Sequence, residues 1–462
     1  MTLEQEQEFA RLRAENAELR QSLAEVQAQL AAALVRIAEL EAQLPGRNDP
    51  PAFVKPARPK PAAGEPQPRR KRAKEHNTSR KRSQPTRIER HALDHCPECQ
   101  YRLQGESLDY RREVIELPPP QPVEVIEHQV VKRWCPHCEC WRSPQLDLSG
   151  QVLGQGRIGV RVAALVAYLR TTLRLPVRQV QAYLATLHGL HLSVGEIVEL
   201  AHAVRKQLQG HADQLLAQVR QQPVVHQDET GWRENGQNGY IWVTASDGPA
   251  AVRYYEYAAS RGHQVPLRLL GEHFRGVLVS DFYAAYNLIP GLHQRCWVHL
   301  LRDLHELKEE QAARADVLQW VQQVRQVYAD AQLWLAAHPT ATAAARRQQY
   351  DALYQRAWHL GQQYAFASAH PCWALAKRLL RHQEELFLFV LTPGLPADNN
   401  LAERSLRPLV IMRKISGGSR SAAGSKTRLT LASLLGTWAA RQLNPLTECL
   451  AALQRPAAIA SG

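Results

Sequence analysis

The sequence has no long apolar run, few cysteines for its length and fewer acidic than basic residues. No apolar stretch approaches the about 18–20 residues that a membrane-spanning helix needs, so a membrane protein is not expected. The N-terminus lacks a basic region followed by an apolar stretch, which argues against secretion. Eight cysteines in 462 residues include two CPxC pairs, a spacing that suits metal binding better than disulfide bonds. We therefore expect a cytoplasmic protein of about two to four domains.

The surplus of positive charge is concentrated in one proline-rich segment. The chain holds 57 Lys or Arg against 44 Asp or Glu, and its formal net charge is +13. Between Lys55 and Arg90, thirteen Lys or Arg stand against three Glu, with almost no large apolar residue. Residues 46–90 are therefore predicted to be a disordered basic linker. A polyanion is its expected partner, because neutralised phosphates release counterions; a linker that charge merely keeps in solution is the alternative.

The N-terminal segment carries apolar residues at heptad spacing. One core position of the heptad is occupied by Phe9, Asn16, Leu23, Leu30, Ile37 and Leu44, and the other by Leu12, Leu19, Val26, Ala33 and Leu40. This pattern predicts a coiled coil over residues 1–45 that ends by Pro45. The polar core residue Asn16 favours a parallel dimer. A single helix that packs on its own domain is the alternative.

Two cysteine pairs follow the linker. Each is a CPxC motif, and their four thiols belong to Cys96, Cys99, Cys135 and Cys138. Four thiolates in two such pairs predict one tetrahedral structural Zn²⁺ site in a domain of residues 91–148. Cys140 is a competing thiol, and reduced structural cysteines are the alternative.

Residues 149–220 have a helical pattern. A helix is expected to begin after Pro176 and to end at Gly189. Ser193 and Glu196 form a capping box that opens the next helix. Two helices joined by a short turn are compatible with a helix-turn-helix DNA-binding region, and plain packing explains the pattern equally well.

From residue 221 the pattern changes to strands. Three apolar runs, 223–228, 239–246 and 251–258, are separated by turn signals and followed by a helix at 265–270 and a strand at 277–280. Three meandering strands, a helix and a strand parallel to the first form the ribonuclease-H order. Residues 301–392 look entirely helical, so they are predicted to be an insertion between two core parts, 221–300 and 393–450, before a tail at 451–462. The fold class is thus multidomain α+β.

Three carboxylates stand at informative places in this core. Asp228 and Asp281 follow apolar strands that are expected to stop there, and Glu403 lies in a predicted helix. Carboxylates that meet at the end of a sheet are costly unless cations neutralise them. Hard oxygen ligands suit Mg²⁺ or Mn²⁺, and two such ions can hold both oxygens of a phosphoryl displacement. Each acid alone could instead be a cap or a turn residue.

The motifs around these acids resemble a known family. DETGWR, SDFYAAY, QRCWVHLLRDL and DNNLAERSLRPL are similar to motifs of the bacterial IS66-type insertion-sequence transposases, which belong to the DDE group. The resemblance implies a ribonuclease-H-like catalytic core in which Asp228, Asp281 and Glu403 hold divalent metal. It also implies that the protein cuts the ends of a mobile element and joins them to target DNA. The resemblance also leads us to expect that the protein forms multimers, works with accessory transposition proteins and associates with the bacterial nucleoid.

Several other residues have two interpretations. Cations after Glu403 are candidates for binding DNA phosphates, with helix-surface charge as the alternative: Arg404, Arg407, Arg413, Lys414 and Arg420. Trp232 could stack on an unpaired base or pack in the core. Cys296 and His299 form a CxxH pair, which is too few ligands for a closed zinc site; the resemblance implies that the pair supports the active site by hydrogen bonding. Two other functions compete: a nuclease that only hydrolyses DNA, and a DNA-binding regulatory protein descended from a transposase.

Overall fold

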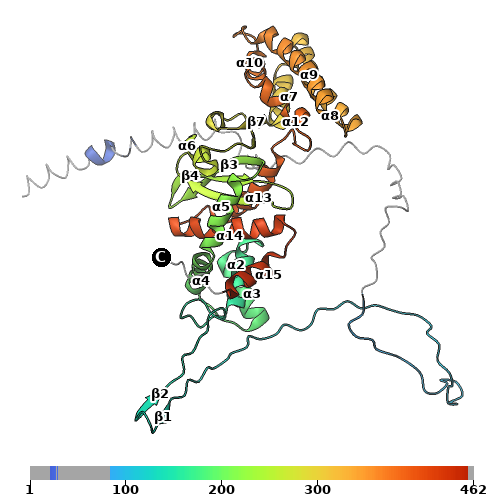
Figure 1. Ribbon diagram of the computed structural model, residues 1–462, viewed down its shortest axis with the longest axis vertical. Helices are drawn as coiled ribbons and strands as arrows, with labels where there is room; N and C mark the ends of the chain where they lie inside the picture. Colours follow the sequence, from blue (N-terminus) through green and yellow to red (C-terminus); the bar gives the residue numbers. More distant parts are fainter. Residues whose placement is uncertain (1–20, 26, 28, 30–83, 456–462) are drawn as a thin grey trace, which may run out of the picture. The chain divides into compact units, whose positions relative to one another are not determined.

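The computed structural model describes residues 21–25, 27, 29 and 84–455 (Figure 1). The chain divides into two compact units, residues 1–116 and 117–462, and each is considered by itself. Within the predicted coiled coil, residues 21–25, 27 and 29 are helical. The rest of that coiled coil, and the basic linker as far as residue 83, lie outside the described residues. Dimerisation through this segment therefore stays a prediction.

The cysteine-rich region has little regular structure and no buried side chain. Its two strands, β1 (Arg133–Cys135) and β2 (Cys140–Arg142), form an antiparallel pair in which Cys135 faces Cys140. Every residue from 91 to 148 is described, and none of them is buried. A segment without an apolar core needs another source of stability, and a bound metal commonly provides it in small domains.

Four helices occupy the region that the sequence predicts to be helical: α2 (Val160–Thr171), α3 (Val177–His188), α4 (Val194–Gln207) and α5 (Gln209–Arg220). Helix α3 ends as expected, because Gly189 adopts the left-handed conformation with φ 63°. The capping box is also present: Glu196 N donates to Ser193 Oγ, and Ser193 N donates to Glu196 Oε2. Apolar residues of α2, α3 and α4 share one small core, which includes Val166, Leu184 and Ile197.

The central sheet has five strands in the order β5-β4-β3-β6-β7. Their bounds are β3 Val224–Glu234, β4 Gln237–Ala245, β5 Arg253–Ala258, β6 Val277–Ser280 and β7 Leu292–Arg295. β4 runs antiparallel to both β3 and β5. β6 lies parallel to β3, and β7 lies parallel to β6. Helix α6 (Gln264–Leu270) connects β5 to β6, and a 3₁₀ helix, η2 (Ala284–Leu288), connects β6 to β7.

One expectation about the first strand is wrong. The strand was expected to stop at Asp228, but β3 continues to Glu234, and Asp228 pairs with Val243 of β4. The continuation is explained by a tight hairpin, because Asn235 (φ 49°) and Gly236 (φ 77°) both have the positive φ of a two-residue turn that holds β3 and β4 together. The parallel pairing with β6 does end before Asp228, since its last pair is His226 with Val279.

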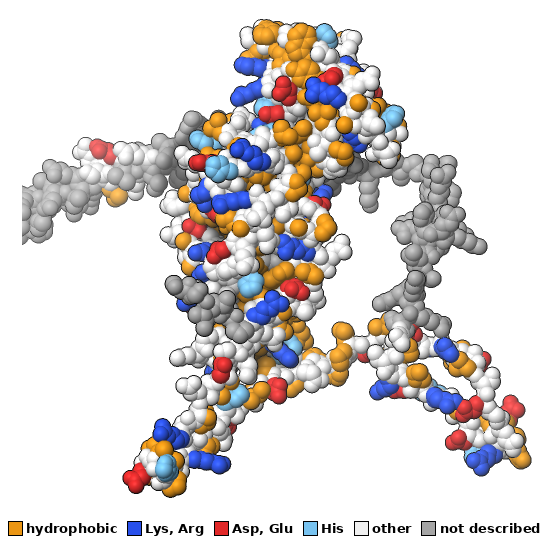
Figure 2. Space-filling model, in the orientation of Figure 1, with side chains coloured by type: hydrophobic (Ala, Val, Ile, Leu, Met, Phe, Trp, Pro, Cys, Tyr) orange, Lys and Arg blue, Asp and Glu red, His pale blue; other side chains and the backbone are white. Residues whose placement is uncertain are grey.

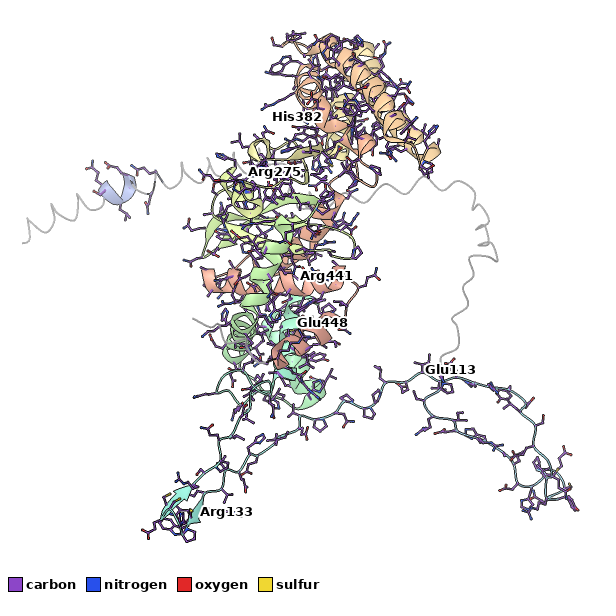
Figure 3. All side chains as sticks on the ribbon, viewed as in Figure 1. Glu113, Arg133, Arg275, His382, Arg441 and Glu448 are labelled. Atoms are coloured by element: carbon purple, nitrogen blue, oxygen red, sulfur yellow. The ribbon has the colours of Figure 1, made fainter. Side chains whose placement is uncertain are left out.

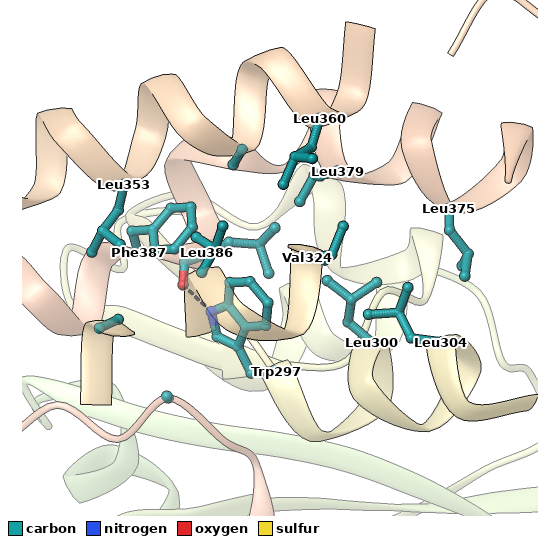
Figure 4. Close-up of a cluster of buried hydrophobic side chains, with 14 of the residues drawn as sticks. Trp297, Leu300, Leu304, Val324, Leu353, Leu360, Leu375, Leu379, Leu386 and Phe387 are labelled. Atoms are coloured by element: carbon teal, nitrogen blue, oxygen red, sulfur yellow. Dashed lines mark hydrogen bonds between the residues drawn. The ribbon is translucent and has the colours of Figure 1, made fainter. Parts of the chain in front are cut away.

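The insertion predicted between the second and third carboxylates is a helical body. It contains α7 (Trp297–Glu310), α8 (Ala315–Ala337), α9 (Ala343–Tyr364), α10 (Trp373–Arg381), α11 (Gln383–Leu386) and α12 (Leu388–Leu391). Its core surrounds Trp297, whose Nε1 donates a hydrogen bond to Leu386 O at 2.6 Å (Figure 4). Pro339 lies between α8 and α9, where it interrupts neither helix.

The two faces of the sheet have different covers. Val277 and Val279 of β6 belong to the core of the helical insertion. On the same face, Ile241 and Val243 of β4 pack against α13 (Asn400–Ser416). The opposite face packs against the N-terminal helices and against two C-terminal helices, α14 (Ala422–Ala440) and α15 (Pro445–Gln454). No helix in the described part of the chain combines the length and apolar composition needed to cross a bilayer.

Candidate active site

The strand register places Asp228 and Asp281 at the same level along two neighbouring strands of the sheet. β3 and β6 are neighbours, and their last parallel pair is His226 with Val279. Asp228 and Asp281 each lie two residues beyond that pair, so they continue the register in step. Because side chains alternate along a strand, the Asp228 carboxylate projects to the face covered by α13 and the insertion, and Asp281 directly follows the last residue of β6. Adjacent strands are about 4.8 Å apart, so the backbone segments that carry the two acids lie close together.

Glu403 reaches this face from the first turn of α13. The helix is fixed to the sheet by its apolar side, because Leu401, Ala402 and Leu406 pack with Ile241 and Val243. Glu403 lies next to these buried positions, and its side chain is 26% exposed. The expected helical position of the third acid is therefore confirmed.

A buried hydrogen-bond network joins the start of α13 to β3. Asn399 Nδ2 donates to Gln227 O at 2.7 Å, and its Oδ1 lies 3.1 Å from His226 Nδ1. Burial lowers the pKa of His226 to about 4, so the ring is neutral and its Nδ1–H must be the donor to Asn399. Asp398, and not Asn399, supplies the local cap, since Asn400 N donates to Asp398 Oδ1. The contacts of Asn399 with β3 join segments that are far apart in the sequence, so no local pattern indicates them.

The charges of these acids interact. Burial raises the pKa of Asp228 to about 8, and the negative charges of Glu229, Asp281 and Glu403 contribute to the rise. Among the described residues, neither Asp228 nor Asp281 forms an ion pair with Lys or Arg. In addition, Glu403 Oε1 is buried without a hydrogen-bond partner in the described structure. The site therefore collects acidic oxygens, and in the described structure no Lys or Arg ion pair neutralises Asp228 or Asp281.

Glu229 belongs to a different environment although it adjoins Asp228. Its side chain points to the opposite face, as the alternation along the strand predicts. There it accepts hydrogen bonds from Tyr286 Oη and from Arg261, whose Nη2 forms an ion pair with Glu229 at 2.6 Å. Burial raises the pKa of Glu229, while these two partners oppose the rise. Glu229 is thus a neutralised structural acid.

The CxxH pair lies beside the third acid. Cys296 is the N-cap residue of α7, and His299 is on the first turn of that helix. His299 Nε2 is 3.7 Å from Glu403 Oε1. One donor atom each from Cys296, His299 and Glu403 lies within 4.8 Å of the other two. The sequence showed the pair but not its neighbour, because residue 403 approaches only through the packing of α13.

The cysteines of each CPxC pair have the local geometry of a metal knuckle. Backbone N–H groups of Cys99 and Glu98 donate to the Cys96 sulfur and lower the pKa of that thiol. Cys135 has the same environment, supplied by Cys138 and His137. The two pairs fall in the two different units of the chain, so a shared four-cysteine site stays a prediction.

The candidate DNA-binding cations differ in exposure. Arg404, Arg407, Lys414 and Arg420 are exposed, whereas Arg413 is half-buried and donates to Gly231 O of β3. Arg413 therefore has a structural contact besides any contact with DNA. On the face shown in Figure 2, basic side chains of the compact region are interspersed with acidic ones and form no single basic patch among the described residues. Trp232 is 2% exposed, so it packs in the core and is not available for base stacking.

Comparison with known proteins agrees with this organisation. Residues 155–427 match the model of the family described as transposase IS66 family, which covers more than half of the chain. The chain belongs to the IS66 transposase family. Residues 94–139 match the zinc-finger binding domain of transposase IS66, which supports zinc binding by the cysteine-rich region. The resemblance seen in the motifs is confirmed.

Relatives from Sinorhizobium fredii cover parts of the chain. Uncharacterized protein y4qI is 27% identical over 344 residues, which are 63% of this chain and 61% of the relative. Uncharacterized protein y4jD is 27% identical over 332 residues, or 64% and 63% of the two chains. Uncharacterized protein y4jO is 30% identical over 162 residues, or 35% and 47%. The chain thus spans less than two thirds of the length of each relative.

Proposed function

We propose that this protein is a DNA transposase that cuts the ends of an insertion sequence and joins them to target DNA. Asp228, Asp281 and Glu403 form its catalytic triad in this proposal. Its main support is the placement of the three acids on β3, directly after β6 and on α13, where burial and the charges of Glu229, Asp281 and Glu403 raise the pKa of Asp228. Membership of the IS66 transposase family supports the reaction type.

The proposed core is ribonuclease-H-like. Its support is the strand order β5-β4-β3-β6-β7, with three antiparallel strands, a helix and a strand parallel to the first. In such a sheet Asp228 and Asp281 stand just beyond the last parallel pair of β3 and β6. The helical insertion then separates the second and third acids in sequence without separating them in space.

Asp228, Asp281 and Glu403 offer the kind of donors that two Mg²⁺ or Mn²⁺ ions need, although their oxygens are not all within 4.8 Å of one another in the described structure. Carboxylate oxygens are the donors that these hard cations prefer, and Glu403 Oε1 is a buried oxygen that lacks a partner in the described structure. Bound ions would lower the pKa of the attacking water or 3′-hydroxyl and stabilise the leaving oxygen. Asp228, Asp281 and Glu403 would hold them. The network between Asn399 and β3 fixes the first turn of α13, which carries Glu403, to the sheet.

DNA is the proposed partner, and its phosphates have several candidate contacts. Arg404 and Arg407 are exposed on α13, one turn from Glu403, where they can position a strand without reading its sequence. Lys414, Arg420 and Arg413 continue this series. Helices α3 and α4 are a candidate helix-turn-helix, and the basic linker would add electrostatic attraction. The cysteine-rich domain would hold one structural Zn²⁺ through Cys96, Cys99, Cys135 and Cys138. Self-association through the coiled coil, accessory transposition proteins and a cytoplasmic, nucleoid-associated location complete the proposal.

The decisive experiment compares Asp281→Asn with Asp247→Asn. Asp247 is an exposed residue after β4 and serves as the matched control. The substrate is a plasmid that carries the coding region with its flanking DNA, incubated with Mg²⁺ and purified full-length protein. We expect Asp281→Asn to reduce cleavage by about 10³-fold or more, because a proposed ligand to the catalytic metal would be lost, and Asp247→Asn to cleave normally. Unchanged cleavage by Asp281→Asn would overturn the site.

A second arm separates transposition from its rivals. A DNA fragment from the same flanking region with a pre-cut 3′-hydroxyl end is mixed with a target plasmid and Mg²⁺. A transposase gives a joined product, because the freed 3′-hydroxyl attacks the target in the same in-line displacement. Cleavage of the first plasmid without joining would identify a nuclease. Binding without metal-dependent cleavage would identify a DNA-binding regulatory protein.

A further inference from the structure

Three donor groups of different chemistry converge where α13 approaches α7, and the third carboxylate, Glu403, is one of them. Cys296 and His299 are three residues apart on the first turn of α7, so their side chains lie on the same side of the helix. Glu403 approaches them from α13, with Oε1 at 3.7 Å from His299 Nε2. All three donor atoms lie within 4.8 Å of one another, and no other such group of three occurs among the described residues.

The donor set suits a softer metal than magnesium. A thiolate, an imidazole and one carboxylate oxygen are ligands of Zn²⁺, which binds sulfur at about 2.3 Å and nitrogen or oxygen at about 2.0–2.2 Å. Ligand atoms on such a tetrahedral ion are about 3.4–3.7 Å apart. The present spacing therefore needs only small rotations of His299 and Glu403. Both side chains are about one quarter exposed, 25% and 26%, which provides a route for the ion and room for a fourth ligand such as water.

The surroundings leave these donors incompletely satisfied. Glu403 Oε1 and His299 Nδ1 are buried without a hydrogen-bond partner in the described structure. The Cys296 sulfur is fully buried and accepts a hydrogen bond from Asn399 N at 3.2 Å. Hydrogen bonds to a ligand atom orient it and tune the metal that it holds. A buried carboxylate oxygen without a partner is expensive, and a cation removes that cost.

We propose that Cys296, His299 and Glu403 form a Zn²⁺ site that competes with the catalytic ions for Glu403. Binding forms one bond each from zinc to Cys296 Sγ, His299 Nε2 and a Glu403 oxygen. The thiol proton of Cys296 passes to solvent, and no group is oxidised or reduced. Zinc bound in this way turns Glu403 toward α7 and away from Asp228 and Asp281. The binding itself stands on this geometry alone, whereas the inhibition rests on the proposed function.

The first test counts zinc on the full-length protein without DNA. Wild type, Cys296→Ser and His299→Gln are dialysed against buffered Zn²⁺, and the bound metal is measured. Cys449→Ser is the matched control, because Cys449 is an equally buried thiol in α15. We expect Cys296→Ser and His299→Gln each to bind about one zinc ion fewer per chain than wild type and Cys449→Ser. Circular dichroism confirms that each variant is folded. Equal zinc contents in all four proteins would overturn the site.

The second test measures Mg²⁺-dependent plasmid cleavage at increasing Zn²⁺ concentrations. The Zn²⁺ concentration that halves cleavage is expected to rise at least about tenfold in Cys296→Ser relative to the Cys449→Ser control, since a ligand is removed. If Cys296→Ser loses its zinc ion but cleavage stays equally sensitive to zinc, competition for Glu403 is refuted. If wild type shows no cleavage at all, the proposed function fails, and the zinc count still decides whether the site exists.

Discussion

Two buried groups of charges in the same unit follow opposite rules. Where β7 meets the helical insertion, Arg295 of β7 has a fully buried side chain and forms an ion pair with Glu385 of α11, which also contacts His382. His382 follows α10 and is labelled in Figure 3. Burial favours the neutral form of Glu385, but His382 and Arg295 outweigh it and lower the pKa of this carboxyl to about 2. At the sheet edge, burial and neighbouring acids raise the pKa of Asp228 to about 8.

The difference lies in the partners and not in the burial. Glu385 has two basic side chains in contact with it, so its charge is neutralised inside the protein. Asp228 faces Asp281 and Glu403, and in the described structure no Lys or Arg forms an ion pair with it. The first arrangement stabilises the fold, whereas the second leaves negative charge that a cation from outside must neutralise. Uncompensated acids at a sheet edge therefore favour a binding role over a structural one.

The largest effect is expected when the compensated pair is broken. Glu385→Gln should lower the free energy of unfolding at pH 7 by about 3 kcal/mol, because it leaves the buried Arg295 without its counter-charge. The folded-state pKa of Glu385 is lowered from 4.5 to about 2, so its contribution is present above pH 4.5. The loss should shrink as the pH falls through about 2. Urea unfolding at several pH values measures it.

The control for this prediction is the adjacent residue Glu384, which is exposed. Glu384→Gln should change the free energy of unfolding by less than about 0.5 kcal/mol. If the two variants are equally stable at pH 7, the ion pair does not contribute to folding and the contrast between the two regions disappears.

A change in stability of the opposite sign is expected when Asp228 on β3 is replaced. Asp228→Asn should stabilise the metal-free protein by about 1–2 kcal/mol at pH 8, because it removes a buried charge that other acids repel. The folded-state pKa of Asp228 is raised from 3.8 to about 8. Its favourable contribution is therefore complete below pH 3.8 and is lost as the pH rises through about 8, so the advantage of Asn should grow over that range. Thermal unfolding with and without Mg²⁺ measures both effects.

Mg²⁺ should reverse the order, because an ion that binds only the folded wild type stabilises it. Asp247→Asn is the control, with no expected change in either condition. A less stable Asp228→Asn protein at pH 8 without metal would contradict the view that the acids are uncompensated.

The smallest effect is expected on the opposite face of β3. Arg261→Met should destabilise the protein by about 0.5–1 kcal/mol, because it removes the ion pair with Glu229. The effect is limited since the Arg261 side chain is 45% exposed and solvent partly replaces it. Arg268→Met, which removes a more exposed pair with Glu256, should cost less. Chemical denaturation compares the variants. A loss of stability for Arg261→Met that exceeds the loss for Glu385→Gln would contradict the view that the Arg295–Glu385 pair contributes more to folding than the Arg261–Glu229 pair.

Local patterns predicted much of the fold. The capping box at Ser193, the end of α3 at Gly189 and the helical insertion depend on neighbours in sequence, so their signals are complete without tertiary contacts. The end of β3 was predicted wrongly. The change from apolar to polar residues at Asp228 marks the end of the pairing between β3 and β6, whereas the pairing between β3 and β4 continues to Glu234. Strand β7 was not predicted, because its four residues carry no distinctive apolar pattern.

Contacts between distant segments were beyond the sequence. His226 and Asn399 are 173 positions apart, and no local rule joins them. The approach of His299 to Glu403 likewise depends on how α13 and α7 pack around the sheet. Arg413 looked like its exposed neighbours, yet it donates to the backbone of β3. Such contacts are decided only by the tertiary packing of the helices against the sheet.

The sequence by itself determined which acids, thiols and cations are present, the local helices and strands that carry them, and the family to which the chain belongs. Tertiary structure alone decided that Asp281 and Glu403 act on the charge of Asp228, that Glu229 is neutralised on the other face, and that a cysteine and a histidine stand behind Glu403. The reason is physical: propensity and capping act over a few residues, whereas the pKa of a carboxyl depends on every charge and every apolar group that packing brings near it.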